Sequence, residues 1–142
     1  IQPAAGDAGG ALGAALGVWH KYLNKPRTIK TGDAMRGSYL GPKFSDAEVS
    51  TFLDSKAIPY QLLANAELNT RVADLLNDGS VVGWFQGRME FGPRALGNRT
   101  ILGDARHPDM QKKMNLKIKF REGFRPFAPA VLAEDVADCG PT

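Results

Sequence analysis

The chain has 142 residues and a mass of 15.3 kDa, which is enough for one domain with a hydrophobic core. Its composition, 43% apolar and 23% charged residues, argues against intrinsic disorder. The single cysteine, Cys139, excludes an internal disulfide and shows no metal-ligand spacing. No apolar run approaches the roughly 18 to 20 residues that a membrane-spanning helix needs. We therefore expect a globular, cytoplasmic protein.

Positive charge is concentrated in one part of the chain. The formal net charge is only +3, but between Arg88 and Arg125 ten Lys and Arg residues stand against four Asp and Glu residues, a local excess of +6. Such a field would raise the local concentration of small anions, or attract a nucleic-acid backbone. The charge pattern is therefore compatible with either a small anion or a nucleic acid as the ligand.

The first third of the sequence predicts two helices separated by a linker. Gly-rich residues 6–10 lead into an Ala- and Leu-rich stretch, residues 11–23, which should be a helix that stops before Pro26. Residues 25–39 have no sustained periodicity and predict a linker, so we place a domain boundary there. Ser45 and Glu48 form a capping-box pattern that predicts a helix over residues 46–56.

The next segment predicts a helix followed by a strand. Asn65 can cap a helix that Gly79 ends, and four apolar residues share one face of it: Leu68, Val72, Leu75 and Leu76. We expect this helix and the helix before it to face the core. Residues 81–85 are mostly β-branched and aromatic, which predicts a buried strand.

The remaining elements complete an α/β (α+β) pattern. Residues 100–102 predict a short strand, and residues 109–120 predict a helix whose buried side carries Met110, Met114 and Ile118. Residues 127–132 are apolar and extended, with prolines that confine them to an edge or a bulge. Helices that alternate with strands indicate a layered α/β or α+β fold.

The most informative stretch is the loop that follows residues 81–85. Residues 87–102 read GRMEFGPRALGNRTIL and contain Arg88, Arg94, Asn98 and Arg99. Guanidinium groups present forked donors that match phosphate or carboxylate oxygens, and ligands of open α/β sheets bind beyond the carboxyl ends of strands. The loop therefore predicts an anion site.

A structural role for these residues is the alternative. The arginines could pair with Glu90 and Asp104 or brace the loop through backbone carbonyls, and we assign such bracing to at least one of them. Asn98 could simply stitch the turn. Further along, Lys119 and Arg121 have a similar explanation, because cations are favoured at a helix carboxyl end.

Two motifs together resemble a known family. Residues 81–103, continued by REGFRPFAP at residues 121–129, resemble the signature of O-carbamoyltransferases of the NodU/CmcH family. QPAAGDAGGALGAA, residues 2–15, resembles the end of that family's actin-like domain. The resemblance implies the end of the actin-like domain at residues 1–24, a linker at 25–39 and, at residues 40–142, an incomplete YrdC-like twisted sheet with flanking helices. It also implies that the chain is a carboxyl-terminal fragment, inactive by itself.

The resemblance also implies a reaction and the residues that perform it. In this family the second domain activates carbamoyl phosphate with ATP and Mg²⁺ as carbamoyl adenylate, and the carbamoyl group passes to a hydroxyl acceptor in the other domain. Four arginines inherit phosphate-binding, catalytic roles: Arg88, Arg94, Arg99 and Arg125. Four further residues become candidates for binding the nucleotide: Asn98, Arg106, Lys119 and Arg121.

Asp7 is the metal candidate. By itself, an aspartate at a helix entrance is most often an N-cap or part of an Asx turn. In the resemblance Asp7 lies in a Gly-Asp-Ala-Gly motif whose aspartate helps two histidines to hold iron or a similar divalent metal. We expect those histidines upstream of Ile1, since neither His20 nor His107 has a suitable context.

Two rival functions remain. One is an enzyme like those that make threonylcarbamoyl adenylate, against which the motif around Asp7 and the linker argue. The other is a basic nucleic-acid-binding module, which the lack of aromatic residues interleaved with basic ones makes less favoured. The partners that the resemblance implies are carbamoyl phosphate, a small hydroxyl-bearing acceptor, the family's amino-terminal domain and, as an option, a second copy of the chain; a membrane is not among them.

Overall fold

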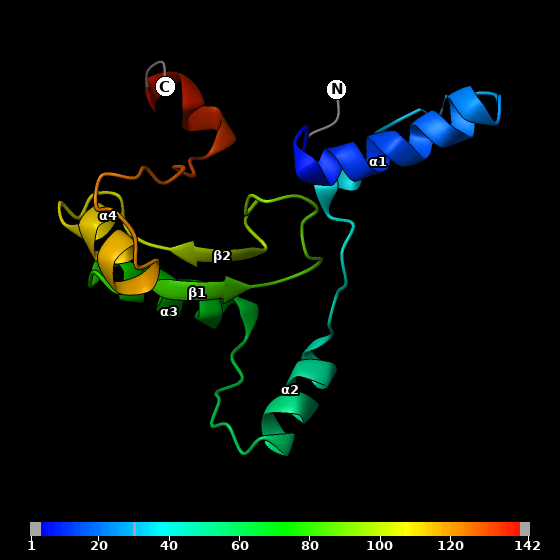
Figure 1. Cartoon of the computed structure of the whole chain (residues 1–142). Helices are drawn as coiled ribbons and strands as arrows, with labels where there is room; N and C mark the ends of the chain where they lie inside the picture. The colour runs from blue at the N-terminus through cyan, green and yellow to red at the C-terminus, as the bar shows by residue number, and fades with distance from the viewer. Residues whose placement is uncertain (1–3, 30, 140–142) are drawn as a thin grey trace. The chain divides into compact units, whose positions relative to one another are not determined.

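The computed structural model describes residues 4–29 and 31–139 (Figure 1). Contacts between residues divide the chain into two compact units. The first unit consists of Ile1–Leu62 and Gly83–Ile101, and the second consists of Leu63–Val82 and Leu102–Thr142. The domain boundary over residues 25–39 stays a prediction.

The first unit holds two helices and most of a two-stranded sheet. Helix α1 covers Asp7–Gly17 and continues as a wider helical turn over Val18–Tyr22. Helix α2 covers Asp46–Ser55. Strand β1 (Val82–Phe85) pairs with β2 (Arg99–Leu102), and Figure 1 shows the two strands antiparallel. The arginine-rich loop is therefore the connection of a hairpin, rather than a loop at the edge of a parallel sheet.

The second unit is helical. It contains α3 (Asn65–Asn77) and α4 (Met110–Lys113), which continues as a wider helical turn over Met114–Ile118. A 3₁₀ helix over Ala133–Cys139 ends the described chain. Helices combined with a small antiparallel sheet confirm the predicted α/β (α+β) class. The YrdC-like character of the sheet stays a prediction.

The predicted capping box of α2 is confirmed. The Ser45 hydroxyl accepts a hydrogen bond from the backbone N–H of Glu48 at 3.3 Å, and the Glu48 carboxylate accepts one from the backbone N–H of Ser45 at 2.7 Å. The bond from the Ser45 backbone is the main reason that the pKa of Glu48 lies below its ordinary value. The cap predicted for Asn65 is wrong: α3 begins with Ala64 as its N-cap, and no side chain caps it.

Burial is where the structure departs most from the sequence-based expectations. Strand β1 is half-buried rather than buried, and Phe85 is 55% exposed, because two strands leave one face of the sheet uncovered in the described chain. Met110 and Met114 are buried as predicted, but Ile118 is 43% exposed. The wider turn that begins at Met114 changes the angle between successive residues and rotates Ile118 out of the row.

Two other expectations concern the end of the chain and its relation to membranes. Residues 127–132 form no strand, and the 3₁₀ helix that follows them was not predicted. Over the described residues, no helix combines the length and the apolar character needed to span a bilayer.

Candidate functional site

The loop between β1 and β2 is organised around the carboxylate of Glu90. One oxygen, Oε1, accepts hydrogen bonds from the backbone N–H groups of Leu96 at 3.1 Å, Asn98 at 2.7 Å and Arg99 at 3.0 Å. Burial by itself raises the pKa of Glu90, but these backbone bonds, with that of Arg99 the largest, outweigh it and lower the pKa below its ordinary value. Glu90 thus fills, from within the loop, the kind of backbone nest in which an external anion could bind.

Arg99 braces the same loop from the start of β2. Its guanidinium donates to the backbone carbonyls of Gln86, Asn98 at 3.1 Å and Gly87 at 3.2 Å. It also stacks on Phe85, with the guanidinium carbon 3.5 Å from the ring centroid. This is the bracing role that we considered for at least one of the three loop arginines.

Arg88 and Asn98 join the loop to its surroundings. Arg88 donates to the carbonyl of Gly41 at 3.0 Å, and its backbone bridges to Lys43. Asn98 donates from its side-chain amide to the carbonyl of Arg88 at 2.7 Å, so it stitches the turn. Both side chains hold backbone in place, although Arg88 is exposed and keeps part of its guanidinium accessible.

Arg94 differs from the other loop arginines. Its side chain is exposed, and within the described residues its guanidinium has neither an ion pair nor a hydrogen bond. It lines a cavity of about 200 Å³ together with Ala4, Gly6, Ser38 and Gly92. Of the three arginines predicted in this loop, Arg88 and Arg99 donate to backbone carbonyls, and only Arg94 has no such acceptor within the described residues.

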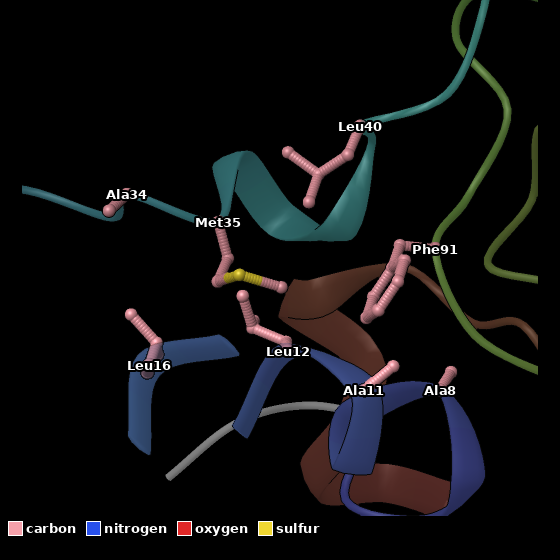
Figure 2. A pocket seen from close by; sticks show the side chains of 8 residues that line it. All are labelled: Ala8, Ala11, Leu12, Leu16, Ala34, Met35, Leu40 and Phe91. Atoms are coloured by element: carbon pink, nitrogen blue, oxygen red, sulfur yellow. The ribbon is translucent and has the colours of Figure 1, made fainter. Parts of the chain in front are cut away.

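A second cavity of the first unit is apolar. It has a volume of about 710 Å³ and lies between α1 and the segment around Met35, with Phe91 from the loop on its wall (Figure 2). Figure 2 shows the side chains of Leu12, Met35 and Phe91 directed toward the same space. This cavity offers no charged group to an anion, so it is no part of the predicted phosphate site.

In the second unit Asn115 organises the segment that carries the remaining basic candidates. Its side chain is fully buried, and its amide donates to the carbonyls of Gly123 at 3.2 Å and Arg125 at 2.8 Å. Its oxygen accepts from Nε of Arg121 at 2.7 Å, and Arg121 also lies over the ring of Phe127 at 4.9 Å. Sequence reasoning missed Asn115; its only signal was a polar residue next to Met114 on a predicted buried face.

The other basic candidates of the second unit are exposed, and two of them form ion pairs. Arg106 contacts Asp104 at 2.6 Å, and this side-chain hydrogen bond is the main reason that the pKa of Asp104 falls to about 2. Arg125 contacts Glu122 at 2.7 Å, which lowers the pKa of Glu122 and raises that of Arg125. Lys119 lies at the end of the turn after α4, as the helix-dipole explanation assumed.

Asp7 lies in the first turn of α1, with an exposed side chain. Over the described residues, no group of three or more His, Cys, Asp or Glu side chains could hold a metal ion. His20 is used locally, with Nδ1 2.9 Å from the carbonyl of Lys25. His107 lies against Gly79, where a Cβ would come within 2.9 Å of Nε2. Within the described residues, Asp7 could therefore be a single metal ligand but not part of a complete metal site.

Comparisons with known proteins relate the part of the chain that carries most of these residues to a known family. Residues 73–141 match the family model described as the carbamoyltransferase C-terminus. The chain carries a carbamoyltransferase C-terminus. Every candidate residue except Asp7 lies inside the matched range, and the family named from the motifs is confirmed.

Individual relatives match the chain almost from end to end. It is 61% identical over 140 residues to the uncharacterized protein sll1178 of Synechocystis sp., 44% over 137 residues to nodulation protein NolNO of Sinorhizobium fredii, and 32% over 136 residues to the 3′-hydroxymethylcephem-O-carbamoyltransferase of Streptomyces clavuligerus. These matches cover 97%, 95% and 96% of the chain, but 23%, 19% and 23% of the respective relative. The chain thus spans about a quarter or less of the length of these relatives.

Sequence reasoning about the carbamoyltransferase C-terminus also missed Ser38. This residue precedes the matched range and is 1% exposed, yet within the described residues its hydroxyl has no hydrogen-bond partner. Ser38 stands in a stretch that looked like a linker and has no motif of its own. In the folded first unit it lines the same cavity as Arg94.

Proposed function

We propose that the full protein is an O-carbamoyltransferase that activates carbamoyl phosphate with ATP and transfers the carbamoyl group to a hydroxyl acceptor. The observation that carries this proposal is the carbamoyltransferase C-terminus at residues 73–141, which contains eight of the nine candidate residues. One relative is named for the carbamoylation of a hydroxymethyl group, which supports a hydroxyl as the acceptor. The acceptor of this protein would be recognised by parts of the full protein outside this chain.

The proposed reaction has three steps. Water cleaves carbamoyl phosphate to carbamate and phosphate. A carbamate oxygen then attacks the α-phosphorus of ATP, and pyrophosphate leaves, which gives carbamoyl adenylate. The acceptor hydroxyl finally attacks the carbamoyl carbon, its proton is released, and AMP leaves with the electron pair of the broken C–O bond. Phosphoryl transfer of this kind needs neutralised charge and alignment more than a strong protein base.

Residue types in the chain suit this need for positive charge. We assign direct phosphate contacts to Arg88, Arg94 and Arg125, since each is exposed and can present its guanidinium to a ligand. Arg99 is assigned as a positioning residue, because its donors already hold the loop carbonyls. The nucleotide, with Mg²⁺, is proposed to contact the four remaining basic and amide candidates: Asn98, Arg106, Lys119 and Arg121.

Asp7 is proposed as one ligand of a divalent metal such as iron in the full protein. An exposed carboxylate at the start of a helix is a suitable hard donor, and the other ligands would have to come from outside the described residues. When bound, such a metal would polarise the carbamoyl carbonyl. Asp7 would hold the ion, while the charge of the leaving adenylate would be met by other groups.

The test is isotope exchange between pyrophosphate and ATP, catalysed by the full-length protein. Exchange should appear only when carbamoyl phosphate is present, because formation of carbamoyl adenylate is the step that releases pyrophosphate. An Arg88→Gln variant should lose about tenfold or more of the exchange, as expected for one charged contact of about 1.5 to 3 kcal/mol. Arg27→Gln, which removes the same charge from an exposed position outside the loop, is the control. Cleavage of ATP to ADP, or exchange without carbamoyl phosphate, would contradict the proposal.

A further inference from the structure

The segment after α4 is tied to the interior of the second unit by the side chain of Asn115. This side chain is 0% exposed, and its amide nitrogen donates to the carbonyls of Gly123 at 3.2 Å and Arg125 at 2.8 Å. Its oxygen accepts from Nε of Arg121 at 2.7 Å, and the backbone N–H of Arg121 donates to the carbonyl of Asn115 at 3.0 Å. Because both ends of the buried amide are bonded, it fixes the positions of its neighbours.

Phe120, the residue before this segment, has a strained backbone. Its φ of +49° lies in the left-handed region, which is an outlier for a bulky side chain. The side chain is 86% exposed, so its own packing does not explain the conformation. Such strain persists only where the surroundings impose it, and it is concentrated at sites that hold ligands. The two bonds between Arg121 and Asn115, directly after Phe120, are the constraint.

These bonds determine how Arg121 can present its guanidinium. Nε is held by Asn115, and the guanidinium carbon lies 4.9 Å from the ring centroid of Phe127. A hydrogen bond at one end and an aromatic ring under one face restrict rotation of the group. Within the described residues, its two terminal nitrogens have no acceptor. They form a fork whose geometry matches two oxygens of a phosphate group.

Arg121 also keeps its full charge, because the acceptor of its Nε is a neutral amide. Arg106 and Arg125, by contrast, contact carboxylates at 2.6 and 2.7 Å. The nearest carboxylate in sequence is that of Glu122, whose pKa is lowered mainly by its hydrogen bond with Arg125 and least by the charge of Arg121. Arg121 is therefore both oriented and charged, and since it is half-buried, a bound anion would be partly shielded from water.

We propose that Asn115 is a positioning residue for nucleotide binding: it holds Nε of Arg121 so that the two terminal nitrogens of this guanidinium meet phosphate oxygens of ATP. The inference rests on the proposed function for the identity of the nucleotide. It adds Asn115, and it assigns Arg121 to the phosphates rather than to the base. The physical gain is pre-organisation, because the guanidinium is ordered before the ligand arrives.

The test is calorimetric titration of the full-length protein with ATP and Mg²⁺, and separately with adenosine. Arg121→Gln should weaken ATP binding about 10- to 100-fold, as expected for a charged hydrogen bond, and leave adenosine binding unchanged. Equal losses for ATP and adenosine would place Arg121 at the base or ribose and overturn the assignment to the phosphates. Absence of ATP binding by the wild-type protein would overturn the inference as a whole.

A double-mutant cycle separates positioning from general stability. Asn115→Ala should weaken ATP binding about 3- to 10-fold in the wild-type background, but less than about twofold when Arg121 is already Gln, since its effect passes through that arginine. Gln111→Ala is the control: Gln111 donates to the carbonyls of Phe124 at 3.3 Å and Arg125 at 3.1 Å, and so ties the same segment without contacting Arg121. Its effect should be less than about twofold. Equal losses for Gln111→Ala and Asn115→Ala, or an Asn115→Ala loss that is the same in both backgrounds, would overturn the positioning role.

Arg121→Lys keeps the test decisive if Asn115→Ala disorders the segment. Lysine carries the same charge but has neither the Nε–H that Asn115 accepts nor the planar fork, so this variant should lose about as much ATP affinity as Arg121→Gln. ATP binding at the wild-type level would show that charge alone suffices and would overturn the inference. Failure of the proposed function looks different. Coupled losses of ATP binding without pyrophosphate exchange remove the reaction alone, whereas exchange that persists without coupling between Asn115 and Arg121 removes the positioning role alone.

Discussion

The arginines on the two sides of β2 are used in opposite ways. In the loop between β1 and β2 and at the start of β2, Arg88 and Arg99 donate to backbone carbonyls, and Arg94 lines a cavity. After β2, Arg106 and Arg125 pair with nearby carboxylates. Both regions carry a net positive charge in sequence, but Arg94 is the arginine among them whose guanidinium has neither an ion pair nor a hydrogen bond within the described residues.

The comparison teaches that an excess of charge does not by itself locate an anion site. Glu90 could have neutralised a loop arginine, but it binds three backbone N–H groups instead. Asp104 and Glu122, by contrast, sit within three residues of the arginines they pair with. Local pairing of this kind partly neutralises Arg106 and Arg125, whereas Arg94 has neither an acidic partner nor a backbone acceptor within the described residues.

The largest expected effect is at Asn115, on the basic side of the comparison. Asn115→Ala leaves two carbonyls and the Nε of Arg121 without their partner in a buried place, so we expect local stability to fall by about 3 kcal/mol. Hydrogen exchange of residues 121–127 in the full-length protein would measure this as about a hundredfold loss of protection. Gln111→Ala is the control, since Gln111 donates to the same segment from an exposed side chain. Equal losses in the two variants would show that Asn115 is not the organising residue.

Glu90 should have the next largest effect, in the loop. Glu90→Ala removes the acceptor of three backbone N–H groups, and we expect about 2 kcal/mol of local stability to be lost, seen as faster hydrogen exchange at Leu96, Asn98 and Arg99. Glu90→Gln keeps a side-chain oxygen and should lose less than half as much. A Gln variant as destabilised as the Ala variant would mean that the charge, rather than the acceptor geometry, holds the loop.

A smaller effect separates Arg99 from Arg94. Arg99→Gln should lower the local stability of the loop by about 1 kcal/mol, since it removes donors to three carbonyls and a contact with Phe85. Arg94→Gln should change loop stability by less than about 0.5 kcal/mol. Limited proteolysis between residues 86 and 98 would compare the two variants. Equal sensitivity to protease would remove the distinction between a bracing and a binding arginine.

The smallest effect is a pH dependence at Asp104. Its pKa is about 2 in the folded chain against an ordinary value of 3.8, so its pairing with Arg106 contributes fully above about pH 4 and is lost as the pH falls through about 2. Because the Arg106 side chain is 77% exposed, solvent screens the pair and the effect on stability should be slight. Titration of the Asp104 carboxyl carbon by NMR, with Arg106→Gln as the comparison, checks the sign. A midpoint near 3.8 in the native protein would show that the pair does not form in solution.

Local signals in the sequence predicted the parts of the fold that local interactions determine. The capping box at Ser45, the strand before the loop, and the burial of Met110 and Met114 all depend on residues a few positions apart. Ile118 was placed wrongly because the regular helical period gives way to a wider turn. Element type was therefore predicted more reliably than the direction of individual side chains.

The site was predictable in place but not in detail. The loop was located from its arginines and glycines, yet the sequence did not reveal which arginine is free. That depends on contacts between residues far apart in the chain, such as Arg88 with Gly41, 47 positions away, and Tyr39 with Leu96, 57 positions away. Ser38 and Asn115 were missed for the same reason, since each matters only through what surrounds it in space.

The close approach of Gly92 to Ala4 has a practical consequence for anyone who dissects this protein. A piece trimmed to the matched residues 73–141 would keep Arg94 but discard Ala4, Gly6 and Ser38, and with them most of the wall opposite the arginine. The same contact, in which a Cβ at position 92 would lie 2.8 Å from the Cβ of Ala4, predicts that a residue larger than glycine at position 92 would require glycine at position 4 or a displaced backbone. Ser38, from the predicted linker, and the residues before α1 are thus parts of the cavity wall that the matched range does not contain.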